Sequence, residues 1–199
     1  MSSIFILEDV GRNNISVKIL ETKKSDLDGI QELLVDNEKL TYNKAIEFDG
    51  SYKPDIDESL KITNFELPSE INEAINNPLA VEKIDFQQGD NLNLRALFLP
   101  TNDDSRETRI IFQRIKKQQI LLANNITLLW DKSTFTSSKK PGVVITNSID
   151  AYYEEGTLYF KSYYWANQIL NLNSYYRDAT DDDIKEFCLN NCFSVEDLE

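Results

Sequence analysis

The sequence predicts an α+β fold, with a central, largely antiparallel or mixed β-sheet flanked by helices. Short runs of β-branched and aromatic residues recur along the chain and are joined by polar turns, a pattern typical of such sheets. Four other segments carry apolar residues at helical spacing behind a serine or threonine that can cap a helix. The length fits a single domain over residues 1–199.

The chain is expected to open with a strand pair followed by a helix. Residues 4–7 and 15–20 are β-branched runs on either side of the turn-forming residues 11–14. Ser25 is placed to cap an amphipathic helix over residues 26–37.

A weaker pattern follows this helix. We expect a short strand at residues 44–48 and an acidic, turn-rich surface loop at residues 49–59. Ser69 is then placed to cap a short helix that ends before Pro78, because a proline disfavours helical geometry in the residue before it.

The middle of the chain is expected to be β-structure. Residues 92–98 alternate in polarity and end at Pro100, and residues 109–115 form the next strand. Shorter candidate strands are residues 119–122, 126–130 and 143–145.

A hairpin and two helices are expected to complete the domain. Residues 154–156 form the expected three-residue hairpin loop, in which Gly156 takes the positive φ that such loops need. Ser162 is placed to cap a helix over residues 163–172, and Thr180 begins a last helix.

Composition excludes several functional classes. The chain has no histidine, which removes Ser-His-Asp and Cys-His catalysis and His-ligated zinc. Its six single glycines form neither a GxGxxG nor a GxxxxGK[ST] phosphate-binding pattern. Cys188 and Cys192 are expected to be small buried hydrophobes, with a metal or redox pair as the alternative. We therefore assign no catalytic residue, and expect no cofactor and no metal.

The sequence contains neither a candidate membrane-spanning segment nor the features of a signal peptide. It has no run of about 18 apolar residues, and its N-terminus lacks the basic and small-residue features of a signal peptide. We expect a cytoplasmic protein that does not insert directly into a membrane.

Positive charge gathers in one segment of an acidic chain. The net charge of the protein is −13, yet residues 106–149 carry eight basic side chains against two acidic ones. Such a segment can contact nucleic acid or an acidic partner, although a solvated sheet face with clustered charges is the alternative. The candidate binding residues are Arg109, Arg114, Lys116, Lys117, Lys132, Lys139 and Lys140.

Aromatic residues gather near the end of the chain. Exposed rings could stack on bases or contact a partner protein, whereas rings at regular spacing more often belong to a core. Tyr152 and Tyr159 fall on the hairpin face opposite Leu158 and Phe160, so they should lie outside the main core or under another layer. The candidate contact residues are Tyr152, Tyr159, Tyr164, Trp165 and Tyr176.

A divalent-metal nuclease is the weakest of the candidate functions. Pro54 and Asp55, with Glu58 and Lys61, resemble fragments of the PD…(D/E)xK nuclease pattern. Their spacing is too short for acids on two different strands, so solvated loop charge explains them better.

Residues 110–125 and 142–180 resemble the bacterial domain-of-unknown-function family that includes the KwaB subunit of the Kiwa anti-phage defence system. The shared pattern is a polar strand, then a hydrophobic strand entering an aspartate, a hairpin and an aromatic helix. The resemblance implies a cytoplasmic defence protein that associates with itself and with a membrane partner subunit, and that binds DNA. Because relatives are longer, it also implies that these residues are the N-terminal part of a longer protein.

Together these observations predict a non-enzymatic, KwaB-like defence protein that binds nucleic acid or a partner through its basic segment. The first alternative is an interaction or oligomerisation module that uses the aromatic helix over residues 163–176. A divalent-metal nuclease is the second alternative.

Overall fold

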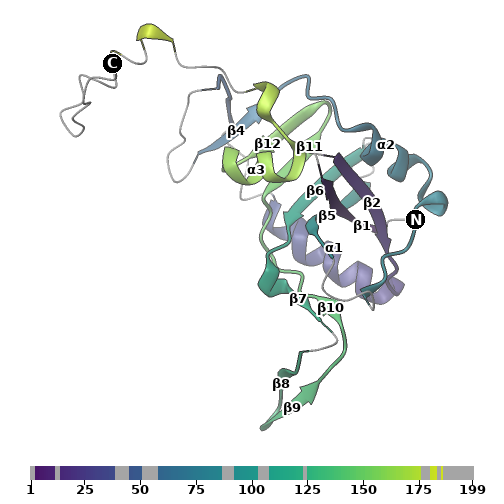
Figure 1. The fold of residues 1–199 in the computed structure, drawn as a ribbon. Helices are drawn as coiled ribbons and strands as arrows, with labels where there is room; N and C mark the ends of the chain where they lie inside the picture. Colours follow the sequence, from purple (N-terminus) through teal and green to yellow (C-terminus); the bar gives the residue numbers. More distant parts are fainter. Residues whose placement is uncertain are drawn as a thin grey trace.

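The computed structural model of the protein describes residues 3–11, 14–38, 45–50, 58–86, 92–102, 108–122, 125–175, 180–182 and 185. Within these residues, eight strands form one mixed sheet in the order β2-β1-β5-β6-β11-β12-β4-β3, and helices lie against it (Figure 1). The predicted α+β class is confirmed. The sheet strands are β1 (Ile4–Gly11), β2 (Asn14–Leu20), β3 (Ala45–Glu47), β4 (Ser59–Ile62), β5 (Leu94–Asn102), β6 (Thr108–Arg114), β11 (Ala151–Glu154) and β12 (Thr157–Phe160).

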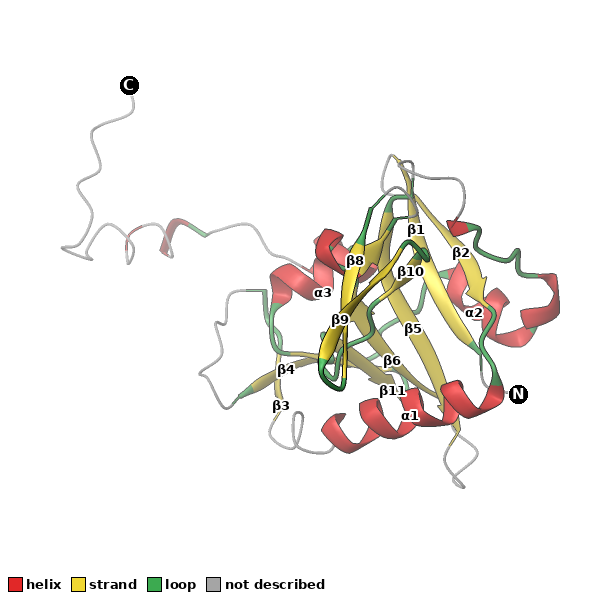
Figure 2. Ribbon diagram, turned by 90° about the horizontal axis from the view of Figure 1, so that it is seen from below, coloured by secondary structure: helices red, strands yellow, loops and turns green. Residues whose placement is uncertain are grey.

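Helices pack against both faces of the sheet. The helices are α1 (Lys24–Glu38), α2 (Ser69–Asn76) and α3 (Tyr163–Leu170). Figure 2 shows α1 on one side of the sheet and α2 and α3 on the other. The first core cluster joins α2 and α3 to side chains such as Phe98, and the second joins Leu34 of α1 to side chains such as Leu97. Neighbouring residues of β5 therefore both lie in a core, as expected when successive side chains point to opposite faces.

The first half of the chain confirms the predicted order of elements but not the predicted caps. β1 and β2 pair antiparallel, and α1 and α2 lie where helices were expected. Ser25 lies inside α1, since the helix begins at Lys24. Ser69 is the first residue of α2 and not its cap, and the cap position is taken by Pro68, which makes no side-chain cap hydrogen bond.

One strand of the sheet was missed and another is longer than expected. The loop predicted over residues 49–59 ends in β4, whose Ser59 is buried; residues 51–57 lie outside the described parts of the chain. β5 runs past Pro100, which lies beyond the last pair with β1, so the missing N–H interrupts no ladder on that side.

A bulge in β5 changes which face its first residues occupy. The register with β1 shifts between Leu94 and Ala96, and Arg95 is the extra residue. Leu94 therefore lies in the second core cluster, whereas Ala96 and Phe98 lie in the first. The alternation predicted through residues 92–98 is wrong at this point.

The β11–β12 hairpin has a two-residue loop where the sequence predicted three. Glu154 pairs with Thr157, which leaves Glu155 and Gly156 as the loop, with φ values of 50° and 74°. Positive φ at both positions is the requirement of a type I′ turn, so the expectation for Gly156 is confirmed.

The helix after this hairpin begins as expected and ends early. Ser162 Oγ accepts a hydrogen bond from the Trp165 N–H at 3.4 Å, so the predicted cap is confirmed. α3 ends at Leu170 because Asn171 adopts a left-handed conformation with φ of 52°. Of the helix predicted after Thr180, the structure describes only residues 180–182 and 185; Cys188 and Cys192 lie outside the described parts.

A second, smaller β-structure leaves the body between β6 and β11. Its inner part pairs β7 (Ile120–Leu121) with β10 (Gly142–Val143), after the short 3-10 helix η3 (Lys117–Gln119). Its outer part pairs β8 (Thr127–Asp131) with β9 (Thr134–Ser138), a strand that the sequence analysis missed. Figure 1 shows this outer hairpin projecting well beyond the sheet and helices. Residues 126–140 are called the arm below.

Candidate functional site

The arm exposes an unusual amount of apolar surface on one face. Leu128 and Trp130 lie on one face of β8, and Phe135, the Cα partner of Trp130 on β9, shares that face. Ile126 lies directly before β8 and continues the same alternation. Each of the four side chains is between 61% and 63% exposed. The rings of Trp130 and Phe135 meet edge to face, with centroids 4.9 Å apart. A contiguous exposed apolar face of this kind marks an interaction site.

A free hairpin of this size gains little stability in water. Two-stranded ribbons are marginal unless a further layer covers their apolar face. Among the described residues, β8 and β9 form a two-stranded sheet of their own. The arm therefore presents both free strand edges and an uncovered apolar face.

The rest of the arm is polar and basic. Its other face carries four hydroxyl side chains around Leu129. Lys132 lies in the tip, with φ of 52°, and Lys139 and Lys140 lie at the base; all three are exposed. Asp131 is the one acidic residue of the arm, so residues 126–140 carry a charge of +2. Because the net charge of the protein is −13, the rest of the chain carries −15.

Two of the predicted basic contact residues make contacts within the fold. Arg109 forms an ion pair with Glu154 through its Nε. Arg114 lies over the ring of Trp165, with its guanidinium carbon 3.2 Å from the ring centroid, and its backbone N–H donates to Asp150 at 2.7 Å. A cation over an indole face is a stabilising contact, so Arg114 joins β6 to α3.

The five predicted lysines are all exposed. Lys116 and Lys117 lie at the start of η3, and the other three belong to the arm. The structure thus collects the exposed part of the predicted basic segment on the arm and beside its base.

The predicted aromatic contact residues are mostly packed inside. Tyr152 is 5% exposed, and Tyr159 packs with it in the second core cluster, at a centroid distance of 5.7 Å. These two rings lie under the α1 layer, as the strand pattern indicated. Trp165 is partly buried against Arg114, whereas Tyr164 is 60% exposed. Tyr176 lies outside the described residues.

Sequence reasoning missed the aromatic residues that are most exposed. Trp130 was included in a predicted strand, and Phe135 was assigned to none. A run such as residues 126–130 has the same appearance whether its strand is buried or projects into solvent. The available signal was that positions 131–134 and 136–140 contain no apolar residue. A strand pairing with residues 126–130 therefore has few apolar side chains with which to build a core.

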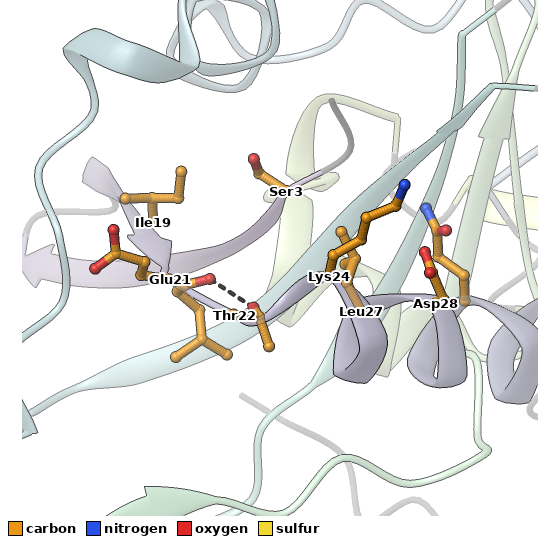
Figure 3. Close-up of a pocket in the computed structure, with 9 residues that line it drawn as sticks. Ser3, Ile19, Glu21, Thr22, Lys24, Leu27 and Asp28 are labelled. Atoms are coloured by element: carbon orange, nitrogen blue, oxygen red, sulfur yellow. Dashed lines mark hydrogen bonds between the residues drawn. The ribbon is translucent and has the colours of Figure 1, made fainter.

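A cavity lies elsewhere on the described surface, at the start of α1. It has a volume of about 480 Å³. Figure 3 shows Lys24, Leu27 and Asp28 from α1 facing the end of β2, where Thr22 donates a hydrogen bond to the Leu20 carbonyl at 2.8 Å. Its wall combines Lys24 and two acids with aliphatic side chains and the hydroxyls of Ser3 and Thr22. The Thr22 hydroxyl donates to a backbone carbonyl and not to a base.

Several acidic residues of the described parts form ion pairs. Lys83 pairs with Glu21 at 2.8 Å, and Lys18 pairs with Glu82. The hydrogen bond from Lys18, together with its charge, holds the pKa of Glu82 below the ordinary value of 4.5. Within the described residues, no three of His, Cys, Asp and Glu lie close enough together to hold a metal ion.

Within its described residues, the structure does not bring together the residues that resemble the PD…(D/E)xK nuclease pattern. Asp55 lies outside the described parts, and Lys61 lies in β4 as the Cα partner of Tyr159. Among the described helices, none combines the length and the apolar character needed to cross a membrane.

No protein-family model, no curated protein and no solved structure matches this chain.

Proposed function

We propose that this protein is a non-enzymatic interaction and oligomerisation module, that the arm is its contact surface, and that a second copy of this chain is its partner. The exposed apolar face of Ile126, Leu128, Trp130 and Phe135 carries the proposal. An interaction or oligomerisation module was the first alternative predicted from the sequence, with the helix over residues 163–176 as its contact surface. The proposal keeps this function and assigns the contact surface to the arm.

Charge favours a second copy as the occupant. The arm carries +2 and the remaining chain −15. An arm that reaches the body of another copy therefore brings Lys132, Lys139 and Lys140 toward opposite charge. Such complementarity steers encounter and sets orientation more than it adds affinity.

The apolar face is large enough to offset much of the cost of association. Fully burying a large apolar side chain stabilises by about 1.5–3 kcal/mol. In a twofold dimer each contact occurs twice, and each side chain still has about three fifths of its surface to bury, so four side chains on each of two arms contribute about 7–15 kcal/mol. That sum is of the same size as the estimated cost of association, about 4–15 kcal/mol.

Sedimentation velocity over a concentration series tests this proposal. The unaltered protein is expected to pass from monomer to dimer, and Trp130→Glu to weaken the dimer by at least about 100-fold, because it places a charge in an apolar contact. Tyr164→Glu is the matched control, since Tyr164 is equally exposed but lies on α3. A monomer at every concentration, or equal effects of the two substitutions, would contradict the proposal.

Nucleic-acid binding is the second candidate, favoured by the five exposed lysines on and beside the arm. Each phosphate contact adds salt-sensitive affinity. If this function holds, the affinity for single-stranded DNA falls steeply as the salt concentration rises. A triple variant, with Lys132, Lys139 and Lys140 each changed to Glu, is expected to lower the slope of log affinity against log salt concentration by an amount that corresponds to about three phosphate contacts. A fluorescence anisotropy titration at several salt concentrations measures this, and absence of binding at low salt rejects it.

The resemblance to the family that includes KwaB supplies a biological setting for either function. Anti-phage defence, a cytoplasmic location and a membrane partner subunit stay predictions, since no comparison bears on them. The −15 charge outside the arm favours a protein partner over DNA.

A further inference from the structure

The two limbs that carry the arm are joined to the body by an unusual buried contact. The returning limb, residues 144–148, runs beside the end of β6 without forming a strand with it. Its backbone polar groups are instead bonded by two glutamine side chains, Gln113 and Gln119. Both are buried, at 0% and 9% exposure.

Gln113 binds the far part of the returning limb. Its Nε2 donates to the Thr146 carbonyl at 2.8 Å and to the Ser148 carbonyl, and its Oε1 accepts from the Thr146 N–H at 3.1 Å. The amide thus bonds to backbone groups two residues apart, as a neighbouring strand would. Gln113 belongs to β6, a central strand, so this limb is fixed directly to the sheet.

Gln119 binds the near part of the same limb. Its Nε2 donates to the Val144 carbonyl at 2.8 Å, and its backbone carbonyl accepts from the Val144 N–H at the same distance. Gln119 itself belongs to the outgoing limb, residues 116–122, and its Oε1 accepts from the Lys116 N–H of that limb at 2.9 Å, so the side chain links the two limbs. The pairing of β7 with β10 continues from this point toward the arm.

We infer that Gln113 and Gln119 are positioning residues that fix the direction in which the arm leaves the body. Neither residue belongs to the arm. A buried amide is costly unless it is bonded, and the bonds of both side chains go to the limb segments, with most of them going to the returning limb. The consequence for binding rests on the proposed function of the arm.

The expected size of the effect follows from preorganisation. If the arm points in one direction, little orientational freedom is lost on binding. When the glutamine contacts are removed, only a fraction of the molecules hold the arm in the binding direction, and the apparent affinity falls by that fraction. Loss of the Gln113 contacts is expected to weaken self-association by at least about ten-fold.

Methionine substitutions test the inference, because methionine keeps the chain length of glutamine and removes both hydrogen-bonding groups. Gln113→Met removes the contacts to Thr146 and Ser148. Gln119→Met is the second variant, since its position nearer the surface makes unfolding less of a risk. Gln168→Met on α3 is the matched control.

Two measurements separate arm direction from binding. Spin labels at Thr136, on the polar face of the arm, and at Asn72 on α2, in protein with both cysteines changed to serine, report the distance distribution by double electron–electron resonance. The dissociation constant of self-association comes from sedimentation. We expect a broader distance distribution and weaker association in Gln113→Met and Gln119→Met, and neither change in Gln168→Met.

The outcomes distinguish this inference from the proposed function. An unchanged distance distribution in a folded Gln113→Met or Gln119→Met protein overturns the positioning role. A broader distribution with unchanged self-association overturns its consequence for binding. If the unaltered protein is monomeric throughout, the proposed function fails, yet the distance measurement still decides whether the glutamines fix the arm.

Discussion

Replacing Phe98 by alanine is expected to lower the free energy of unfolding by about 3–5 kcal/mol. Phe98 is fully buried on the face of the sheet that α2 and α3 cover. Its ring stacks on Phe5 at a centroid distance of 4.9 Å and contacts Phe112 at 5.9 Å. Alanine would leave a cavity between three strands, β1, β5 and β6, that are held in register by their ladders and can close only in part. Urea unfolding followed by circular dichroism measures the loss.

The same chemical change on the arm supplies the control. Phe135→Ala removes an identical ring from a position that is 61% exposed. Its effect on the free energy of unfolding is expected to stay within about 0.5 kcal/mol when measured on the monomer. Similar losses for Phe98→Ala and Phe135→Ala would mean that the arm packs against the body in solution, which would contradict its projection from the fold.

Replacing Leu34 by alanine is expected to lower the free energy of unfolding by about 2–5 kcal/mol. Leu34 is the fully buried residue through which α1 enters the second core cluster. Leu27 and Ile30 are only partly buried against that cluster, so they can replace little of the lost contact. Because Leu34 is the fully buried side chain of α1 in this cluster, the amide groups of α1 are also expected to exchange with solvent faster in the variant.

The neighbouring residue provides the comparison. Leu33 is 40% exposed on the same helix, and Leu33→Ala is expected to cost less than about 1 kcal/mol. Unfolding and hydrogen exchange of both variants can be measured side by side. Equal losses at the two positions would mean that α1 is seated on the sheet in a different rotation.

Local chemistry explains the elements that were predicted well. The β11–β12 hairpin follows from Gly156, which accepts a positive φ, and α3 begins directly after Ser162 because the Ser162 hydroxyl accepts a hydrogen bond from the Trp165 N–H of the first turn. Both signals act over a few residues, so neighbouring sequence is sufficient to reveal them. Ser25 and Ser69 carried the same signal, yet neither caps its helix, because α1 begins two residues earlier and α2 one residue earlier than the pattern indicated.

Long-range pairing explains the elements that were missed. β4 contains Lys61 and begins within a run of acidic residues, yet it becomes an inner strand through its pairing with β3 and β12. The face occupied by Leu94 depends on a bulge that exists only where β1 and β5 meet. Neither partner strand can be identified from the residues beside it.

In the candidate site, too, local sequence predicted some features and long-range contacts decided others. The distribution of charge along the sequence pointed to residues 106–149, and the exposed lysines of the arm lie there. Sequence could not tell that Arg109 and Arg114 make contacts within the fold, since Glu154 and Trp165 come close only through the sheet and α3.

The amino-acid sequence alone established the α+β class, the order of most elements and the location of the basic segment, because these depend on local periodicity and composition. The tertiary structure decided which apolar residues are buried. Trp130 and Phe98 both lie in strands, but Phe98 has helices over its face and Trp130 has none among the described residues. Burial depends on what packs above a strand, and that is a property of the whole fold.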